Sequence, residues 1–345
     1  MEYREYLRLV PKIELHCHVV AVLRPERLLG WARERGVALP SEDPDALFDY
    51  DNIVDFLAVF NAAHEVFRTA DDFAVLAYEG VADAVADGNL RYREYYVNPD
   101  NFAHLGIDYP TVIDGLIDGL RRAEAEFGVG FGIVPAVNRS FSLETALALV
   151  ETMAAHPRPE VIGLGQDDLR GDGQESPLDW APVFERAREL GLRVTAHVGE
   201  LPSSCAGDVI TAWDGLELDR VDHGYHVMDD PARVAEARER GIRFTVTPRS
   251  TQFLSGWPLD AEHRIAGMII AGLHVTLATD DQLFFRTSLR EEYEHVGLGM
   301  GFGPDVIEKI VLDAVDATWL DEGPKDALRA DFRGQLRALR AALEA

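Results

Sequence analysis

Two histidines near the N-terminus, His16 and His18, flank Cys17 at the end of a short apolar run. In a β-strand, residues i and i+2 project from the same face, so both imidazoles point one way while Cys17 points the other way. Neutral imidazole is the commonest protein ligand for zinc, so this pair is a candidate half of a metal site. Two surface histidines on an edge strand would give the same pattern, and the remaining ligands have to come from elsewhere in the chain.

Three further apolar runs also end in histidine or acidic residues. They carry His197 and Glu200, Asp222 and His223, and Asp280 and Asp281. Each has a structural explanation when taken alone, since His197 fits a buried core histidine and Asp280 a helix N-cap. Taken together, they supply a metal with His16, His18, His197 and Asp280, and leave Glu200, His223 and Asp281 for acid–base chemistry. An open coordination position on zinc would carry a water whose pKa falls toward ~7.

The elements that must position these residues alternate between strand and helix. Eight candidate strands occupy residues 13–18, 90–97, 129–137, 161–164, 192–198, 221–224, 242–247 and 273–279. Most are followed by a helical pattern, which predicts an α/β fold and favours a closed (β/α)8 TIM barrel over an open sheet. Extra helices are inserted after the first strand, at about 41–88, in what we interpret as one domain over 1–345. In such a barrel, the chemistry lies at the carboxyl ends of the strands.

Composition narrows the class of function. The net charge of −27, from 60 acidic and 33 basic residues, argues against binding to nucleic acid or an anionic membrane. Only two cysteines occur, the start of the chain does not resemble a signal peptide, and no apolar stretch approaches ~20 residues. We therefore expect a soluble, cytoplasmic protein that acts on a small molecule. The oligomeric state stays open.

The motifs His16–His18 (HCH), His197–Glu200 (HVGE), Asp222–Gly224 (DHG) and Thr279–Asp281 (TDD) resemble those of the adenosine/adenine deaminase family of the amidohydrolase superfamily. The resemblance runs from about Pro11 to Phe285, and the segments 95–99 and 163–165 are closer to the adenine-deaminase branch.

The resemblance implies a hydrolytic deaminase of an aminopurine or a related aminated heterocycle. It implies one Zn²⁺ per chain, held by the two histidines of HCH, by His197 and by Asp280. It also implies that Glu200 protonates the ring nitrogen beside the attacked carbon. His223 and Asp281 would orient the zinc hydroxide, accept its proton and stabilise the tetrahedral intermediate, after which ammonia leaves.

Several positions that read the substrate in the family differ here. Val20 stands where the family has an acid, Arg249 and Thr251 alter the strand-seven motif, and Gln282 replaces a proline. The segment Gly165–Asp168 differs from both branches. The candidate substrate-binding residues are therefore Gly165, Asp167, Val20, Arg249 and Gln282. These changes predict a substrate other than plain adenosine, such as a modified purine or one with an acidic substituent, which Arg249 could pair with unless it points away into solvent.

Other functions remain open. The chain could be an adenine or adenosine deaminase proper, or a metal-dependent amide or ring hydrolase of the same superfamily. Two-metal relatives often carry a modified lysine, and residues 161–168 contain no lysine. A non-catalytic binding protein is disfavoured because such a protein has no need for Glu200, His223 and Asp281 together. Phe56, Phe60 and Phe67 fit either an apolar lid or an ordinary helix–helix core.

Overall fold

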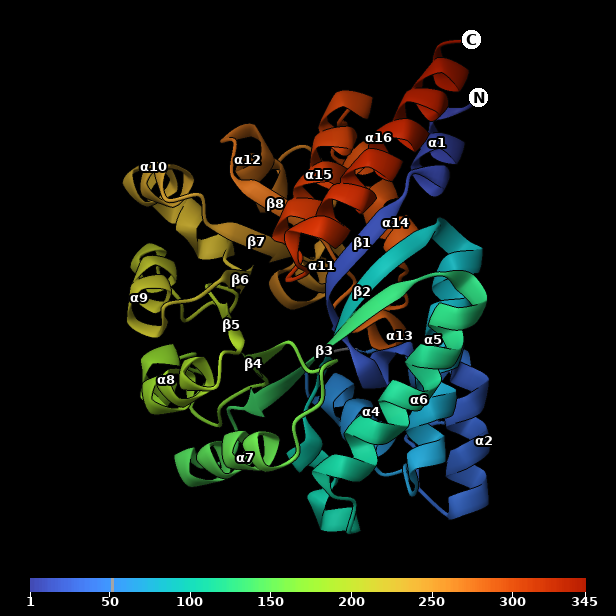
Figure 1. Ribbon diagram of the computed structural model, residues 1–345, viewed down its shortest axis with the longest axis vertical. Coiled ribbons are helices and arrows are strands. Elements are labelled where there is room, and N and C mark those ends of the chain that lie inside the picture. The colour runs from blue at the N-terminus through green and yellow to red at the C-terminus, as the bar shows by residue number, and fades with distance from the viewer. Residues whose placement is uncertain (51–52) are drawn as a thin grey trace.

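Eight parallel strands form the centre of the computed structural model, which describes residues 1–50 and 53–345 (Figure 1). The strands are β1 Lys12–His18, β2 Leu90–Val97, β3 Gly130–Asn138, β4 Gly163–Asp167, β5 Arg193–Val198, β6 Arg220–His223, β7 Arg243–Val246 and β8 His274–Leu277. They pair in chain order, and a parallel bridge between Cys17 and Asp280 joins the first strand to the segment after the last. The predicted (β/α)8 TIM barrel is confirmed.

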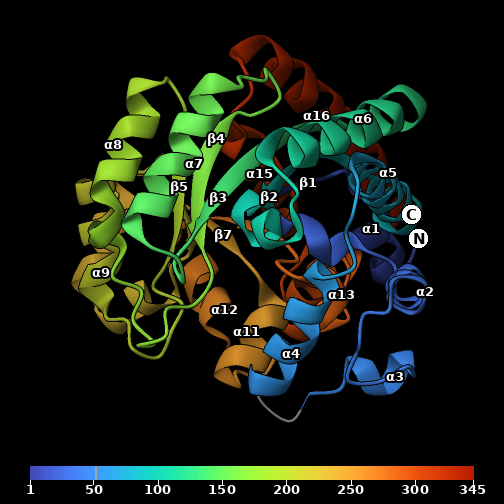
Figure 2. The ribbon, with the colours of Figure 1, turned by 90° about the horizontal axis from the view of Figure 1, so that it is seen from below.

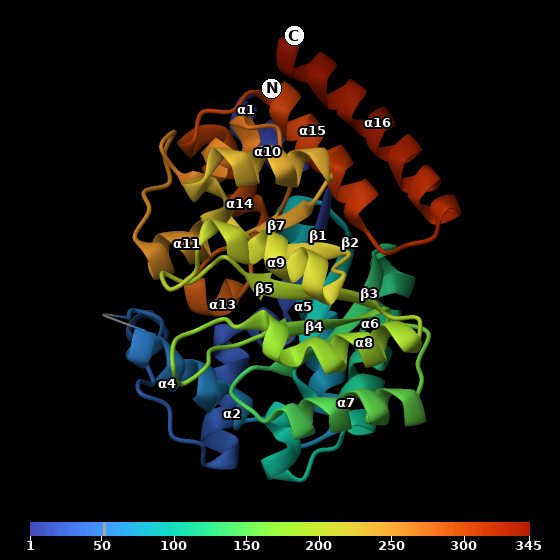
Figure 3. The same cartoon turned by 90° about the vertical axis from the view of Figure 1, so that its left-hand side faces the viewer.

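Helices surround the barrel, as Figures 1 and 3 show. The longer ones are α2 Pro25–Arg35, α4 Ile53–His64, α5 Ala70–Gly88, α6 Tyr109–Phe127, α7 Leu143–Ala155, α8 Ala181–Glu189, α9 Ala206–Leu216, α10 Pro231–Glu239, α11 Pro248–Ser255, α15 Pro304–Ala317 and α16 Glu322–Glu344. The shorter ones are α1 Tyr3–Leu9, α3 Pro44–Leu47, α12 Arg264–Ile270, α13 Gln282–Phe285 and α14 Leu289–Glu294. Short 3₁₀ helices form η1 Val19–Val22, η2 Pro99–Leu105, η3 Pro177–Trp180 and η4 Tyr225–Asp229, and a short π-helix forms η5 His295–Gly299. In the described part of the chain, no helix is both long and apolar enough to cross a membrane.

The segment between β1 and β2 holds α2, α3, α4 and α5. The predicted insertion at 41–88 corresponds to the last three of these, except that residues 51–52 lie outside the described residues. Helix α4 lies on the same side of the barrel as α11 and α13 (Figure 2). Its Phe56 ring stacks on Phe285 of α13, with ring centroids 5.3 Å apart. This contact places an apolar helix beside the strand ends that carry the polar motifs.

Strand β4 differs from the prediction. It begins at Gly163 and ends at Asp167, whereas the apolar pattern predicted 161–164; Val161 forms only an isolated bridge with Ile133. The reason is that Gln166 and Asp167 are buried although polar, so hydrophobicity ends before the strand does. Asp167 therefore belongs to a strand end. Sequence patterns also missed the helix α9, which follows β5.

The contact between α5 and α6 depends on glycine. A Cβ placed at Gly119 would come closer than 3.0 Å to the backbone of Ala74, whereas one at Gly334 in α16 would meet open space. We expect Gly119→Ala to lower the free energy of unfolding by about 1–3 kcal/mol through overpacking. The matched variant Gly334→Ala should raise it by about 0.5–1 kcal/mol, because alanine favours the helix. Denaturant and thermal unfolding measure both, and equal effects would contradict the packing described here.

Candidate metal centre and active site

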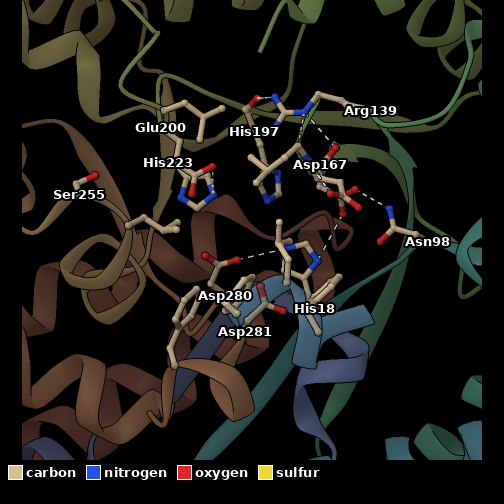
Figure 4. Close-up of a pocket in the computed structure, with 18 of the residues that line it drawn as sticks. His18, Asn98, Arg139, Asp167, His197, Glu200, His223, Ser255, Asp280 and Asp281 are labelled. Atoms are coloured by element: carbon tan, nitrogen blue, oxygen red, sulfur yellow. Dashed lines mark hydrogen bonds and ion pairs between the residues drawn. The ribbon is translucent and has the colours of Figure 1, made fainter. Parts of the chain in front are cut away.

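Three histidines and an aspartate converge at the carboxyl ends of β1, β5 and β8. Potential ligand atoms of His16, His18, His197 and Asp280 all lie within 4.8 Å of one another. The Nε2 atoms of His16 and His18 lie 3.3 and 3.2 Å from the same carboxylate oxygen, Oδ1 of Asp280. Figure 4 shows His18, His197 and Asp280 facing a common point. The structure thus brings together all four residues that the sequence suggested as ligands.

Asp222 fixes the orientation of His16 through a threonine. The Thr245 hydroxyl donates to Oδ1 of Asp222 at 2.8 Å, so its oxygen is left to accept from Nδ1 of His16, which lies 3.0 Å away. We therefore assign the proton of His16 to Nδ1, which leaves Nε2 with a free lone pair. Nε2 is buried and has no hydrogen-bond partner among the described residues.

The other two histidines are oriented in the same sense. Nδ1 of His197 lies 3.4 Å from Oδ2 of Asp222, and Nδ1 of His18 lies 3.5 Å from Oδ2 of Asp167. Metal-bound histidines generally direct their second nitrogen toward a carboxylate in this way. Burial and the neighbouring His16 lower the pKa of His197 to about 3, which keeps its imidazole neutral, as a metal ligand must be.

Asp222 itself is fully buried yet well supplied with donors. Its Oδ2 accepts hydrogen bonds from the Tyr96 hydroxyl at 2.8 Å and the Thr195 hydroxyl at 2.9 Å. Burial raises the pKa of this carboxyl, but the nearby imidazoles of His16 and His197 outweigh burial and hold the pKa below its usual range. The ionised carboxylate is the form that can orient two imidazoles at once.

A second group of side chains adjoins the cluster on one side. Oε2 of Glu200 lies 3.6 Å from Nε2 of His223, whose Nδ1 lies 3.2 Å from the Tyr225 hydroxyl. Burial, followed by the nearby charge of Asp280, raises the pKa of Glu200 well above its usual value. Burial also raises the pKa of Asp281 to about 8, with the charge of Asp280 acting in the same direction. Glu200 therefore holds its proton more tightly than a solvent-exposed glutamate does.

The backbone is strained at two of these positions. His223 and Asp280 have φ of +68° and +62°, in the left-handed region that side chains other than glycine seldom occupy. Such conformations cost about 1–3 kcal/mol each and cluster at functional sites. Asp280 is not a helix N-cap, because Asp281 occupies the cap position of α13.

A cavity of about 280 Å³ opens onto both groups (Figure 4). Its polar wall includes His18, Asn98, Arg139, Asp167, Asp168, His197, Glu200, His223, Asp280 and Asp281. Its apolar wall includes Phe56, Leu57, Phe60, Leu169, Leu201, Pro202, Leu254 and Phe285. A cavity with an apolar slot on one side and acid–base groups on the other fits a flat heterocycle. Phe56 and Phe60 line this cavity, whereas Phe67 is buried against Phe73 and Phe102.

The predicted substrate-binding residues divide into two groups. Asp167 lines the cavity, and Gly165 stands behind it, where a Cβ would lie 2.8 Å from the ring of Tyr96. Glycine at that position thus leaves room for the tyrosine that supports Asp222. Val20 is buried in η1, and it is not among the residues that line the cavity.

Arg249 and Gln282 also lie away from the cavity wall. Nε of Arg249 donates to the Phe285 carbonyl at 3.1 Å, and its Nη1 donates to Gln252. Gln282 lines a separate surface hollow beside Leu23. The structure does not bring either side chain to the cavity, so Arg249 does not stand at the position from which it would pair with an acidic substituent.

Sequence reasoning missed Asp222 as an orienting residue, although it quoted the motif that contains it. The detectable signal was an acid inside an apolar strand, directly before a histidine. It also missed Arg139, whose Nε donates to the carbonyls of Asp167 and Asp168 at 3.1 and 2.8 Å and whose Nη1 donates to the carbonyl of His197. No spacing in the sequence indicates these backbone contacts.

Comparison with known proteins agrees with this geometry. A sequence model of the family described as adenosine deaminase matches residues 11–333. The chain belongs to the adenosine deaminase family. The family resemblance is thereby confirmed, and it extends past Phe285.

Individual relatives cover nearly the whole chain. It is 31% identical over 320 residues to an adenine deaminase of Rhizobium johnstonii, covering 92% of this chain and 98% of that protein. A zinc-bound amidohydrolase structure from Burkholderia ambifaria superposes with a TM-score of 0.90 at 30% identity, covering 99% of this chain and 94% of the other. An adenine deaminase structure from Arthrobacter aurescens gives a TM-score of 0.88 at 26% identity, covering 95% and 99%.

The donor set fits a divalent metal. Buried Nε2 atoms of His16 and His197 lack hydrogen-bond partners among the described residues, and both face the Asp280 carboxylate. Unpaired buried nitrogens of this kind are costly unless a ligand occupies the point where they converge. Imidazole and carboxylate together are the ligands of zinc and related ions.

We expect Asp222→Asn to weaken metal binding by about 10–100-fold. The amide cannot accept hydrogen bonds from both Thr245 and Tyr96, and it no longer presents a negative charge to His197. Competition with a chromogenic chelator measures the affinity. Asp219→Asn is the matched control, since Asp219 precedes the same strand and pairs with the exposed Arg193, and asparagine keeps an oxygen that can accept from the N–H of Val194. Equal affinity for the metal in the Asp222 variant and the parent would contradict the orienting role of Asp222.

Proposed function

We propose that the protein is a zinc-dependent hydrolytic deaminase of an aminopurine, with one Zn²⁺ per chain and the whole chain 1–345 acting as one catalytic domain. The observation that carries the proposal is the convergence of three imidazole nitrogens and Asp280 beside a buried Glu200 in one cavity. Two distant, unpaired cysteines are in keeping with a cytoplasmic setting.

The zinc ligands in this proposal are His16, His18, His197 and Asp280. Zinc held there would lower the pKa of a bound water toward neutrality and so provide the nucleophile. Three residues remain for the protons. They are Glu200, His223 and Asp281.

Glu200 donates a proton to the ring nitrogen next to the carbon that carries the amine, which makes that carbon more electrophilic. The attacking water has two protons to lose. Neutral His223, together with Asp281 in its ionised form, accepts the first and passes it to the departing nitrogen, and the second returns to Glu200 as the new carbonyl forms. The carbon–nitrogen bond breaks, and an aminopurine and water become an oxopurine and ammonia.

The substrate we propose is a neutral aminopurine other than plain adenosine. Of the described residues lining the cavity, Asp167 and Asp168 add negative charge, while Arg139 directs its donors to backbone carbonyls. An anionic substituent would meet like charge there. Two of the relatives named above are adenine deaminases, which makes a free base the nearest precedent.

An amide or ring hydrolase with two metals has less support. Strand β4, whose lysine would bridge a second metal in such barrels, has the sequence Gly163-Leu164-Gly165-Gln166-Asp167. The cluster of His16, His18, His197 and Asp280 contains histidine and aspartate alone. A second group of potential ligands, Glu200, His223 and Asp280, shares Asp280 with it, and we assign its Glu200 and His223 to proton transfer. Retention of the complete acid–base set likewise disfavours a purely binding role.

Glu200→Gln should lower kcat for ammonia release by about 10²–10⁴-fold, since glutamine has the shape of the acid but no proton to give. Metal content measured by atomic emission should stay at the parent level, because Glu200 is not one of the four ligands. Turnover equal to that of the parent would remove Glu200 from the proton-donor role.

A panel of adenine, N6-methyladenine, adenosine and adenosine monophosphate tests the substrate class. We expect a neutral base to have the highest kcat/KM and the monophosphate to be at least about 100-fold poorer, because phosphate enters an acidic cavity. Coupled detection of ammonia measures all four. A preference for adenosine or the monophosphate would overturn the proposed substrate class but would leave the proposed deamination mechanism standing.

A further inference from the structure

A buried carboxylate outside the catalytic set, Glu175, holds the backbone on both sides of Glu200. Its Oε1 accepts from the N–H of Glu200 at 2.8 Å and of Leu201 at 2.9 Å, and its Oε2 accepts from the N–H of Gly199 at 2.6 Å. We propose that Glu175 is the positioning residue that aims Glu200 into the cavity. This inference rests on the function proposed above, in which Glu200 is the proton donor.

The same backbone is held from its other side by β6 and the turn after it. The carbonyl of Gly199 accepts from the N–H of His226 at 3.0 Å, and the N–H of Gly224 donates to the Val198 carbonyl at 2.9 Å. Gly199 has φ of +72°, and a Cβ there would lie 2.8 Å from Val209. The segment 199–201 is therefore fixed between Glu175 and the β6 turn. The direction of the Glu200 side chain follows from that fixed backbone.

The carboxylate suits this task because three N–H groups compensate for its burial. Glu175 is 4% exposed, and an ionised group so placed is tolerated where several donors surround it. The reverse also holds, since Gly199 and Glu200 are buried, and their N–H groups would lose their acceptor without Glu175. Removing the side chain therefore frees the segment that carries the proton donor.

The segment that delivers Glu175 is itself held against the catalytic loop. Ser203 donates from its hydroxyl to the carbonyl of Gly173 at 2.7 Å. Ser176, directly after Glu175, has φ of +38° although Pro177 follows it. A left-handed residue before proline is disfavoured and persists only where surrounding contacts determine it. The contacts of Glu175 and Ser203 supply that constraint.

The test compares Glu175→Ala, Glu175→Gln and the control Asp172→Asn, all in the zinc-loaded full chain. Asp172 lies on the same loop and pairs with Arg170 at the surface, and asparagine keeps the oxygen that accepts from the N–H of Gln174. We expect kcat to fall about 100-fold in the alanine variant, as for a misplaced catalytic group. In the glutamine variant kcat should fall about tenfold, because the amide oxygen can still accept a hydrogen bond from part of the segment 199–201. KM should change less than about threefold, and metal content should match the parent.

Hydrogen exchange adds a readout that is independent of turnover. The amides of residues 199–201 should exchange at least about tenfold faster in Glu175→Ala and at the parent rate in Asp172→Asn. Parental kcat with parental exchange, or a loss of kcat matched by an equal loss of zinc, would overturn the positioning role. If the zinc-loaded parent deaminates no aminopurine, the proposed function fails, and the exchange rates alone then decide whether Glu175 holds this segment.

Discussion

The catalytic end of the barrel depends on one buried carboxylate. Asp222 receives hydroxyl hydrogen bonds from Tyr96 on β2, Thr195 on β5 and Thr245 on β7, so residues of three strands meet at a single charge. A carboxylate removed from water is costly unless such donors surround it. Here three hydroxyl donors surround it. The carboxylate also orients the imidazoles of His16, through Thr245, and of His197, so that their Nε2 atoms face Asp280.

A second buried carboxylate supports the opposite side of the site. Glu14 accepts from the N–H of Thr279 at 2.7 Å and from its hydroxyl at 2.6 Å, while its other oxygen lies 2.5 Å from Nε of Arg93. Thr279 immediately precedes Asp280, whose left-handed backbone needs support. The ion pair between Glu14 and Arg93 inside the barrel thus helps to hold the strained Asp280 in place. These buried polar residues support the site as well as the fold.

The sequence predicted those parts of the site in which a polar residue stands at the end of an apolar strand. His16 and His197 lie near the carboxyl ends of β1 and β5, and Glu200 and Asp280 follow β5 and β8 within a few residues. Both the barrel and the cluster of polar strand ends could therefore be anticipated. The end of β4 could not be anticipated, because Gln166 and Asp167 are polar inside the barrel.

Contacts between a side chain and the backbone of a distant loop also could not be predicted from sequence patterns. Glu175 meets the segment 199–201 across 24 or more residues, and nothing in its own neighbourhood indicates the partner. Arg249 illustrates the converse. Its position in the strand-seven motif suggested a role at the mouth, yet its guanidinium donates to the Phe285 carbonyl and to Gln252.

X-ray absorption at the zinc edge of the loaded protein tests the central claim most directly. Three imidazoles and a carboxylate predict a shell of nitrogen and oxygen at about 2.0–2.2 Å, imidazole multiple scattering and one equivalent of zinc. Sulfur at about 2.3 Å would place the metal on a cysteine instead, and a metal–metal vector with two equivalents would indicate a binuclear centre. Either result would contradict a mononuclear site built from His16, His18, His197 and Asp280.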